Sequence, residues 1–216
     1  MKIDNLKAAV PASYIILYIF WTAVELLLYP SMGEGIAPVI ITDMLLKNLF
    51  WTLPAFLLIG AFDDRMYLKR RELFTNPVNP LAVAGILAAM VAVLLANNMV
   101  THHRFGVTLH FDLTEQLAFV FVGVTEELMF RGWLLNATYS EKHPYLSVGV
   151  NALLFLAIHF PYWIRTGVFA SAFMGGGFLT ILVLSLFFSW NMLHFKNIWV
   201  PIILHMVYDI LVTMLY

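Results

Sequence analysis

The segment Thr125-Glu126-Glu127-Leu128-Met129-Phe130-Arg131 places two carboxylates and a guanidinium inside an otherwise apolar stretch. A charged side chain at the middle of a bilayer costs at least about 2.5–3.5 kcal/mol, so three together indicate a polar interior and a functional site. Glu127 and Arg131 are four residues apart and share one helix face. Glu126 points about 100° away, because a helix has 3.6 residues per turn. The spacing predicts that Arg131 holds one carboxylate and leaves the other available for chemistry.

The same Glu127–Arg131 pair has a second interpretation as an ordinary helix salt bridge. At a protein surface such a pair contributes little to stability and needs no function. Inside a membrane span the helix does not depend on the pair, and removing both charges would lower the cost of insertion. The functional interpretation is therefore preferred for this position.

The composition of the chain indicates a membrane protein. Of its 216 residues, 62% are hydrophobic and only 12% are charged, with a mean hydropathy of +0.85. Soluble domains have about 25% charged residues, and several apolar runs here reach the 18 or more residues of a bilayer span. The runs do not alternate with a period of two, which excludes a membrane β-barrel. The predicted fold class is an all-α, polytopic transmembrane bundle with the lipid bilayer as its surroundings.

Charge and cysteine content exclude some function classes. The formal net charge is −1, which gives no reason to expect nucleic acid as a partner. The chain has no cysteine, so thiol nucleophiles, thiolate metal sites and disulfides are excluded.

About seven spans are expected, in one transmembrane domain over residues 1–216 with a motif-bearing core at about 114–216. No internal repeat or linker divides the chain. The expected spans are Pro11–Tyr29, from near Leu46 to Phe62, Leu81–Val100, Thr114–Thr138, Leu146–Trp163, Val168–Trp190 and Ile198–Tyr216.

Three charged residues in the first two apolar runs need an explanation. Glu25, near the far end of its span, is expected to reach the interface. Asp43 and Lys47 are four residues apart. They form either a salt bridge that neutralises both charges within the span or part of an interfacial helix. The second alternative is preferred, so the span is expected to start near Leu46.

Two later spans carry residues that affect helix geometry. Pro161 is expected to end the fifth span, because proline cannot continue the hydrogen-bond ladder of a helix. Ser171 and the glycines 175–177 are expected to allow close approach of another helix in the sixth span.

Basic residues predict the orientation in the membrane. With the N-terminus inside, eight basic residues lie inside and two outside, which agrees with the positive-inside rule. We therefore expect an integral protein of the plasma membrane with a cytoplasmic N-terminus. The inside residues are Lys2, Lys7, Arg65, Lys69, Arg70, Arg71, Lys142 and Lys196, and the outside residues are Arg104 and Arg165.

Three of the last four spans carry ionisable groups at membrane depth. A lone histidine on an apolar helix is usually a packing residue, but two histidines converging with a glutamate pair and an aspartate are poorly explained in that way. If the spans pack together, these groups can satisfy each other around one water-filled cavity. They are Glu126, Glu127, Arg131, His159, His205 and Asp209.

This set of side chains favours hydrolysis without a covalent intermediate. A carboxylate beside a neutral histidine can deprotonate water, and a second histidine or a cation can stabilise the oxyanion formed at an amide. The chain has neither cysteine nor a Gly-x-Ser-x-Gly elbow.

A zinc site is the alternative use of the same residues. Two histidines with one or two glutamates could bind Zn²⁺. The ligands are scattered over separate spans and no His-Glu-x-x-His is present, so neither a metal site nor a cofactor is predicted. His102, His103, Arg104 and His110 are expected to form a hydrated loop.

The motifs resemble those of a known family. Glu126-Glu127-x-x-x-Arg131, Phe155-x-x-x-His159 and His205-x-x-x-Asp209 look like the three motifs of the CAAX prenyl protease and bacteriocin-processing family, also called the Abi family, of intramembrane endopeptidases. The resemblance runs from about Thr114 to the C-terminus, and the first three spans carry no part of it.

The resemblance implies a role for each motif residue. Glu126 with His159 would activate water, Glu127 and Arg131 would support the site, and His205 with Asp209 would form the oxyanion hole. The last position is often asparagine in the family, whereas an ionised aspartate only accepts hydrogen bonds. Either Asp209 is protonated, or it orients His205 and leaves oxyanion binding to that ring.

The predicted function is an intramembrane endopeptidase that cleaves a membrane-associated peptide or protein. Relatives process prenylated proteins, leader peptides or signalling peptides, and some protect against bacteriocins; the sequence selects none of these and gives no oligomeric state. The alternative is a non-enzymatic immunity factor, or a carrier whose buried carboxylates and histidines relay protons.

Overall fold

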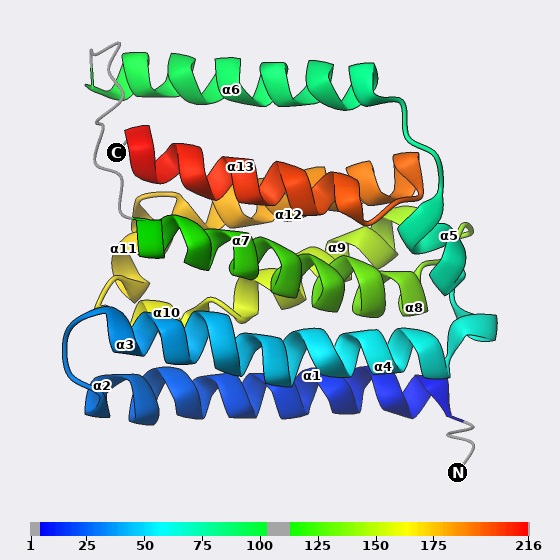
Figure 1. Ribbon diagram of the computed structural model, residues 1–216, viewed down its shortest axis with the longest axis horizontal. Coiled ribbons are helices and arrows are strands. Elements are labelled where there is room, and N and C mark those ends of the chain that lie inside the picture. Colours follow the sequence, from blue (N-terminus) through cyan, green and yellow to red (C-terminus); the bar gives the residue numbers. More distant parts are fainter. Residues whose placement is uncertain (1–4, 103–112, 216) are drawn as a thin grey trace.

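Long helices running side by side make up the structure (Figure 1), a computed structural model that describes residues 5–102 and 113–215. Those residues form helices and turns and no strand. Within these described ranges, five helices are long and apolar enough to cross a membrane, and Trp199–Leu215 is a shorter apolar helix. The predicted all-α polytopic bundle is confirmed. The five are Leu6–Ser31, Ile36–Ala61, Pro80–Val100, Pro144–Arg165 and Gly177–Phe195.

The first two helices form a hairpin at one edge of the molecule (Figure 1). The Asn5 side chain caps the first helix by accepting a hydrogen bond from the Ala8 N–H. Gly33 and Gly35, at φ of 75° and 117°, supply the left-handed turn between the helices. The segments are α1 (Leu6–Ala23), η1 (Val24–Leu28) and α2 (Tyr29–Ser31), then α3 (Ile36–Val39), η2 (Ile40–Leu46), η3 (Asn48–Thr52) and α4 (Leu53–Ala61).

The prediction of an interfacial helix before Leu46 was wrong. The second apolar helix begins at Ile36 and contains Asp43 and Lys47, because the two side chains form an ion pair of 3.1 Å. Segments η2 and η3 of this helix are π-helical, as is η1 of the first helix, and π-helical turns occur often at functional sites.

A short surface region links this hairpin to a peripheral helix. It contains η4 (Asp63–Arg65) and α5 (Arg70–Thr75), followed by α6 (Pro80–His102). The expected histidine-bearing loop lies mainly outside the described residues, since α6 ends at His102.

The charged segment found in the sequence is one helical stretch at the centre of the bundle. It consists of α7 (Leu113–Glu127), the π-helical η5 (Leu128–Leu135) and α8 (Asn136–Thr138). All residues of η5 are buried. Phe130 and Trp133 pack in one core cluster with Trp51 and Ile59 of the second helix. The N-terminal helices therefore share their core with the motif-bearing helix.

The last third of the chain departs from the expected spans at two turns. Helix α9 (Pro144–Ala157) ends at a turn of Ile158 and His159, and Pro161 lies in the first turn of α10 (Phe160–Arg165). Pro161 does not end the span, because a proline at the start of a helix removes no intrahelical hydrogen bond. The remaining helices are α11 (Phe169–Met174), α12 (Gly177–Phe195) and α13 (Trp199–Leu215).

The glycines of the expected sixth span have two roles: Gly175 and Gly176 form a turn, and Gly177 begins α12 close to the backbone of Ala172 in α11, as the expected close approach requires. Gly175 and Gly176 separate α11 from α12, and Gly176 has a left-handed φ of 80°. Glycine adopts this conformation without steric cost.

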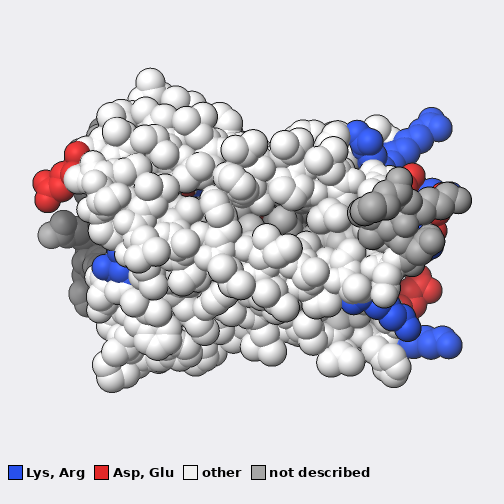
Figure 2. Space-filling model, turned by 90° about the horizontal axis from the view of Figure 1, so that it is seen from below, with Lys and Arg blue, Asp and Glu red and all other residues white. Residues whose placement is uncertain are grey.

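Exposed basic residues gather at one end of the molecule (Figure 2). This is the end at which α1 begins and α5 lies (Figure 1). The described exposed basic residues there are Lys7, Arg65, Lys69, Arg70, Arg71, Lys142 and Lys196.

Candidate active site

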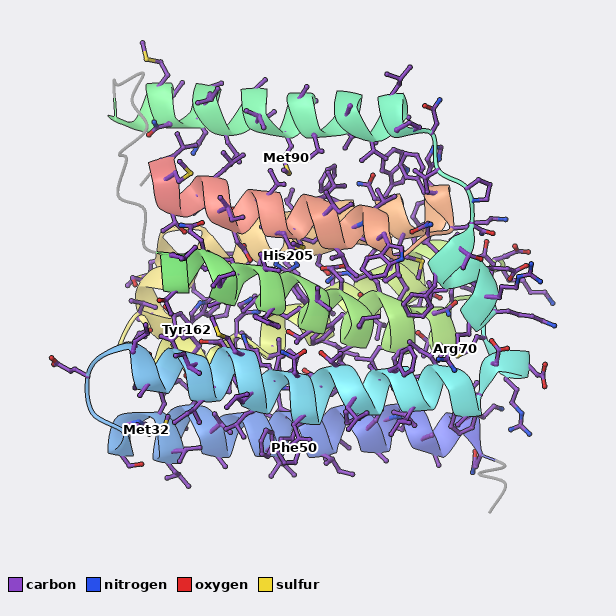
Figure 3. The ribbon with its side chains drawn as sticks, in the orientation of Figure 1. Met32, Phe50, Arg70, Met90, Tyr162 and His205 are labelled. Atoms are coloured by element: carbon purple, nitrogen blue, oxygen red, sulfur yellow. The ribbon has the colours of Figure 1, made fainter. Side chains whose placement is uncertain are left out.

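A cavity of about 590 Å³ lies between the two N-terminal helices and α7, α10, α12 and α13. Four of the six side chains singled out in the sequence line it, namely Glu126, His159, His205 and Asp209. Figure 3 shows His205 among the central helices of the bundle. Three separate helical segments thus bring one glutamate, two histidines and one aspartate to one polar space within apolar helices.

Glu127 and Arg131 lie behind the cavity wall as a fully buried ion pair. The Arg131 guanidinium donates to Glu127 Oε1 at 2.8 Å, as the four-residue spacing predicts. It also donates to the carbonyl and hydroxyl oxygens of Ser185, at 3.1 and 2.8 Å. The guanidinium stacks 4.3 Å from the centre of the Phe155 ring. These contacts offset part of the loss of hydration and fix the position of Glu127, although Glu127 Oε2 and Arg131 Nε make no hydrogen bond with the described residues.

His205 is held by Glu127. Its Nδ1 lies 2.8 Å from Glu127 Oε1. A carboxylate accepts, so Nδ1–H donates in this contact, and Nε2 is the nitrogen on the cavity side. Nε2 lies 3.5 Å from Asp209 Oδ2 and 4.0 Å from Glu126 Oε2. The ring stacks on Phe188 with centroids 4.7 Å apart.

His159 is oriented by the turn that separates α9 from α10. Its Nδ1 lies 2.7 Å from the Phe155 carbonyl oxygen, which can only accept. Nδ1 therefore carries a proton, and in the neutral ring the lone pair is on Nε2. The ring also packs edge-on against Phe155, with centroids 5.0 Å apart. The Phe155-x-x-x-His159 motif thus fixes both the orientation and the tautomer of His159.

Glu126 contacts a cation that the sequence reasoning missed. Lys47, from the second helix, has its Nζ 3.5 Å from Glu126 Oε1 and 3.1 Å from Asp43 Oδ1. Lys47 is only 6% exposed. The signal was present in the sequence, because Asp43 and Lys47 repeat the four-residue acid–base spacing of Glu127 and Arg131 inside an apolar run.

Glu25 is also buried, contrary to the expectation that it reaches the interface. It is 4% exposed, and its Oε2 lies 2.6 Å from Nε of Arg165 at the end of α10. The Arg165 guanidinium lies 3.7 Å from the centre of the Tyr29 ring. Both charged residues line the cavity, and the ion pair with Arg165 holds Glu25 there.

In the part of the chain that the structure describes, no group of three histidine, aspartate or glutamate side chains has the arrangement of a metal site. The zinc alternative thus receives no support from the geometry.

A comparison with protein families covers the segment of the chain that holds these residues. Residues 113–211 match the family model of the Rce1-like type II CAAX prenyl endopeptidases. Comparisons with curated proteins and with solved structures give no significant match. The match begins within one residue of the start expected from the motifs.

The matched segment carries all six motif residues, from Glu126 to Asp209, and the apolar helices around it are those of an integral membrane protein. Residues 113–211 are therefore similar to an Rce1-like type II CAAX prenyl endopeptidase domain, which is a protease domain, and this similarity implies an intramembrane protease.

Proposed function

We propose that the protein hydrolyses a peptide bond of a membrane-associated peptide or protein, with water activated by Glu126 and His159. The observation that carries the proposal is the different placement of the two adjacent glutamates. Glu126 lines the cavity with both histidines, whereas Glu127 is fully buried and bound to Arg131 and His205. Only a carboxylate that reaches a cavity can meet both a water molecule and a substrate.

The proposed reaction begins with a water molecule between Glu126 and His159. Glu126 takes a proton as the water oxygen attacks the scissile carbonyl carbon, and Nε2 of His159 is the second basic atom at this water. The attack forms a tetrahedral oxyanion. The proton then passes to the leaving nitrogen, the C–N bond breaks, and a carboxylic acid and an amine are released. No covalent enzyme intermediate and no cofactor are required.

The oxyanion is assigned to the side of the cavity where His205 and Asp209 lie. Nε2 of His205 and Oδ2 of Asp209 are 3.5 Å apart. A hydrogen-bond donor on either atom can therefore reach an oxyanion at the same place in the cavity. A protonated Asp209 donates directly. An ionised Asp209 instead orients His205. Because the Nδ1–H of the ring is held by Glu127, the ring provides a donor at Nε2 only as the doubly protonated imidazolium.

The test uses the full-length protein in proteoliposomes with internally quenched peptides. One peptide ends in a CAAX-type sequence with a prenyl group, a second is identical without the prenyl group, and a third is an unrelated membrane-spanning peptide. Glu126→Gln keeps the shape of the side chain but removes the base, so cleavage should fall about 10²–10⁴-fold. His159→Ala should also lose most activity, and Glu141→Gln, at an exposed position, is the matched control.

Each result separates the proposal from an alternative. Wild-type cleavage by Glu126→Gln would exclude the glutamate–water mechanism. Protection against a bacteriocin or proton transport that survives in Glu126→Gln would support an immunity factor or carrier. Loss of wild-type cleavage on treatment with a chelator, restored by Zn²⁺, would replace the metal-free reaction with a zinc-dependent one.

A further inference from the structure

Lys47 is a buried cation whose position requires an explanation. It lies between η2 and η3 of the second helix, outside the segment 113–211 that matches the protease family. Its side chain is 8% exposed and lines the cavity. A lysine at membrane depth lowers the stability of an inserted helix unless other groups compensate it.

Four groups compensate the Lys47 ammonium. Asp43 Oδ1 lies 3.1 Å and Glu126 Oε1 3.5 Å from Nζ. The ammonium also lies 4.8 Å from the ring centre of Trp21 and 5.5 Å from that of Trp51, within the range of cation–π attraction. Trp21 and Trp51 are almost fully buried and pack edge to face. The ammonium is thereby fixed beside Glu126.

The pairing of the other buried charges shows what Lys47 does. Glu127 is paired with Arg131, and Glu25 is paired with Arg165. Glu126 shares Lys47 with Asp43. The other ionisable groups around Glu126 are His159, His205 and Asp209 on the cavity side and Arg131 behind Glu127. Among residues 5–102 and 113–215, Lys47 is therefore the permanent positive charge in direct contact with the Glu126 carboxylate.

The two oxygens of Glu126 have different surroundings. Oε1 faces Lys47 at 3.5 Å, and Oε2 faces Nε2 of His205 at 4.0 Å, which is too long for a hydrogen bond. If Lys47 holds Oε1, then Oε2 is the oxygen that remains for a water molecule. A base that is ionised and held in one orientation is what proton abstraction requires.

On the basis of the proposed function, we propose that Lys47 is a positioning residue for the hydrolysis, which keeps Glu126 ionised and turns its Oε2 toward the cavity. The active site is then composite, because the family-matching segment supplies the reacting groups and the N-terminal hairpin supplies the counter-ion of the base.

A labelling experiment tests this without relying on hydrolysis. A hydrophobic carbodiimide modifies protonated carboxyl groups in apolar surroundings, and mass spectrometry of the digested protein locates the modified residue. At neutral pH, Glu126 should resist labelling in the wild type, in Lys47→Arg and in the control Lys7→Met, which removes an exposed lysine. It should be labelled several-fold more in Lys47→Met. Equal labelling of Glu126 in all four proteins would overturn the proposal.

A double variant covers the case in which Lys47→Met does not fold. Lys47→Met with Asp43→Asn removes one charge of each sign, so the net charge of the group is unchanged while Glu126 still loses its cation. Increased labelling of Glu126 in this protein is expected. Labelling at the wild-type level would show that Lys47 does not determine the ionisation of Glu126.

The kinetic readout separates positioning from structural support. With the peptide that the wild type cleaves, the folded fraction of Lys47→Met should have a kcat lower by about 10²-fold with little change in KM, and Lys47→Arg should recover part of the loss. Unchanged kcat per folded molecule would assign Lys47 a purely structural role. Cleavage by Glu126→Gln would instead reject the proposed function, and the labelling result would remain valid.

Discussion

Two adjacent glutamates of this chain have different surroundings because they lie about 100° apart around one helix. Glu127 points into the core, where Arg131 and His205 both contact its Oε1 at 2.8 Å. Glu126 points toward the cavity and contacts Lys47. The same chemical group is thus held in the buried ion pair at one position and faces the cavity at the next.

Asp209 is the residue at which this chain departs from the asparagine often found in the family it resembles. We expect Asp209→Asn to retain activity, because an amide can replace a protonated carboxyl as donor to the oxyanion. The amide does not ionise, so loss of activity at high pH should be smaller than in the wild type. The measurement is a pH–rate profile of both proteins on one internally quenched peptide.

The opposite result has a specific meaning for Asp209. An ionised Asp209 that orients His205 would be replaced by an amide that can present its NH₂ group to Nε2. Activity of Asp209→Asn would then be low at every pH. A matched Asp64→Asn substitution at an exposed carboxylate should leave the profile unchanged.

Helix α7 and helix α13 approach each other closely at Gly123. A Cβ atom at this position would lie 2.6 Å from Met206 Cγ and 3.2 Å from the Met206 backbone nitrogen. Gly123 lies about one helical turn from Glu126 and Glu127, and Met206 follows His205. The glycine therefore allows the approach that brings His205 to Glu127.

We expect Gly123→Ala to separate the two helices and to lower both stability and activity. Overpacking of this kind typically costs about 1–3 kcal/mol. Thermal unfolding in detergent and peptide cleavage are the measurements. Gly85→Ala is the control, because Gly85 is also inside a helix but a Cβ added there would meet no described atom within 4 Å. Wild-type stability and activity in Gly123→Ala would contradict the close packing of α7 and α13.

At the scale of the whole molecule, the family-matching segment does not contain the whole cavity. Trp21, Glu25, Asp43, Lys47 and Trp51 of the N-terminal hairpin line the cavity together with α7, α10, α12 and α13. The hairpin also shares the main hydrophobic core with η5. The N-terminal half is thus part of the site as well as of the membrane anchor.

The unequal charge of the two ends predicts the orientation of the molecule in the membrane. The native chain has no cysteine, so single cysteines can report accessibility without background. In intact cells a membrane-impermeant maleimide should label Glu34→Cys and should not label Lys142→Cys, because the basic end is expected in the cytoplasm. Both should be labelled after permeabilisation. The reverse pattern in intact cells would place the N-terminus outside.

The sequence by itself determined the class of fold, the charged centre and the family. Helices and closed β-barrels satisfy the backbone in lipid, and the long apolar runs without a period of two leave the helical bundle. The Glu127–Arg131 pair followed from local spacing, because residues four apart on a helix are neighbours wherever the helix is placed. Sequence alone was enough to recognise the motif positions, because ionisable residues are rare in apolar segments. These positions are Glu126, His159, His205 and Asp209.

Only the tertiary structure decided which segments surround these residues. Whether Asp43 and Lys47 lie at the interface or in the bundle depends on Glu126, which is 79 residues from Lys47 in the chain. Glu25 is drawn inward by Arg165, which is 140 residues away. Local patterns carry no information about such partners, since burial of a charge depends on a counter-charge that another helix brings. For the same reason the sequence predicted the ionisable groups that line the cavity but not the cation beside Glu126.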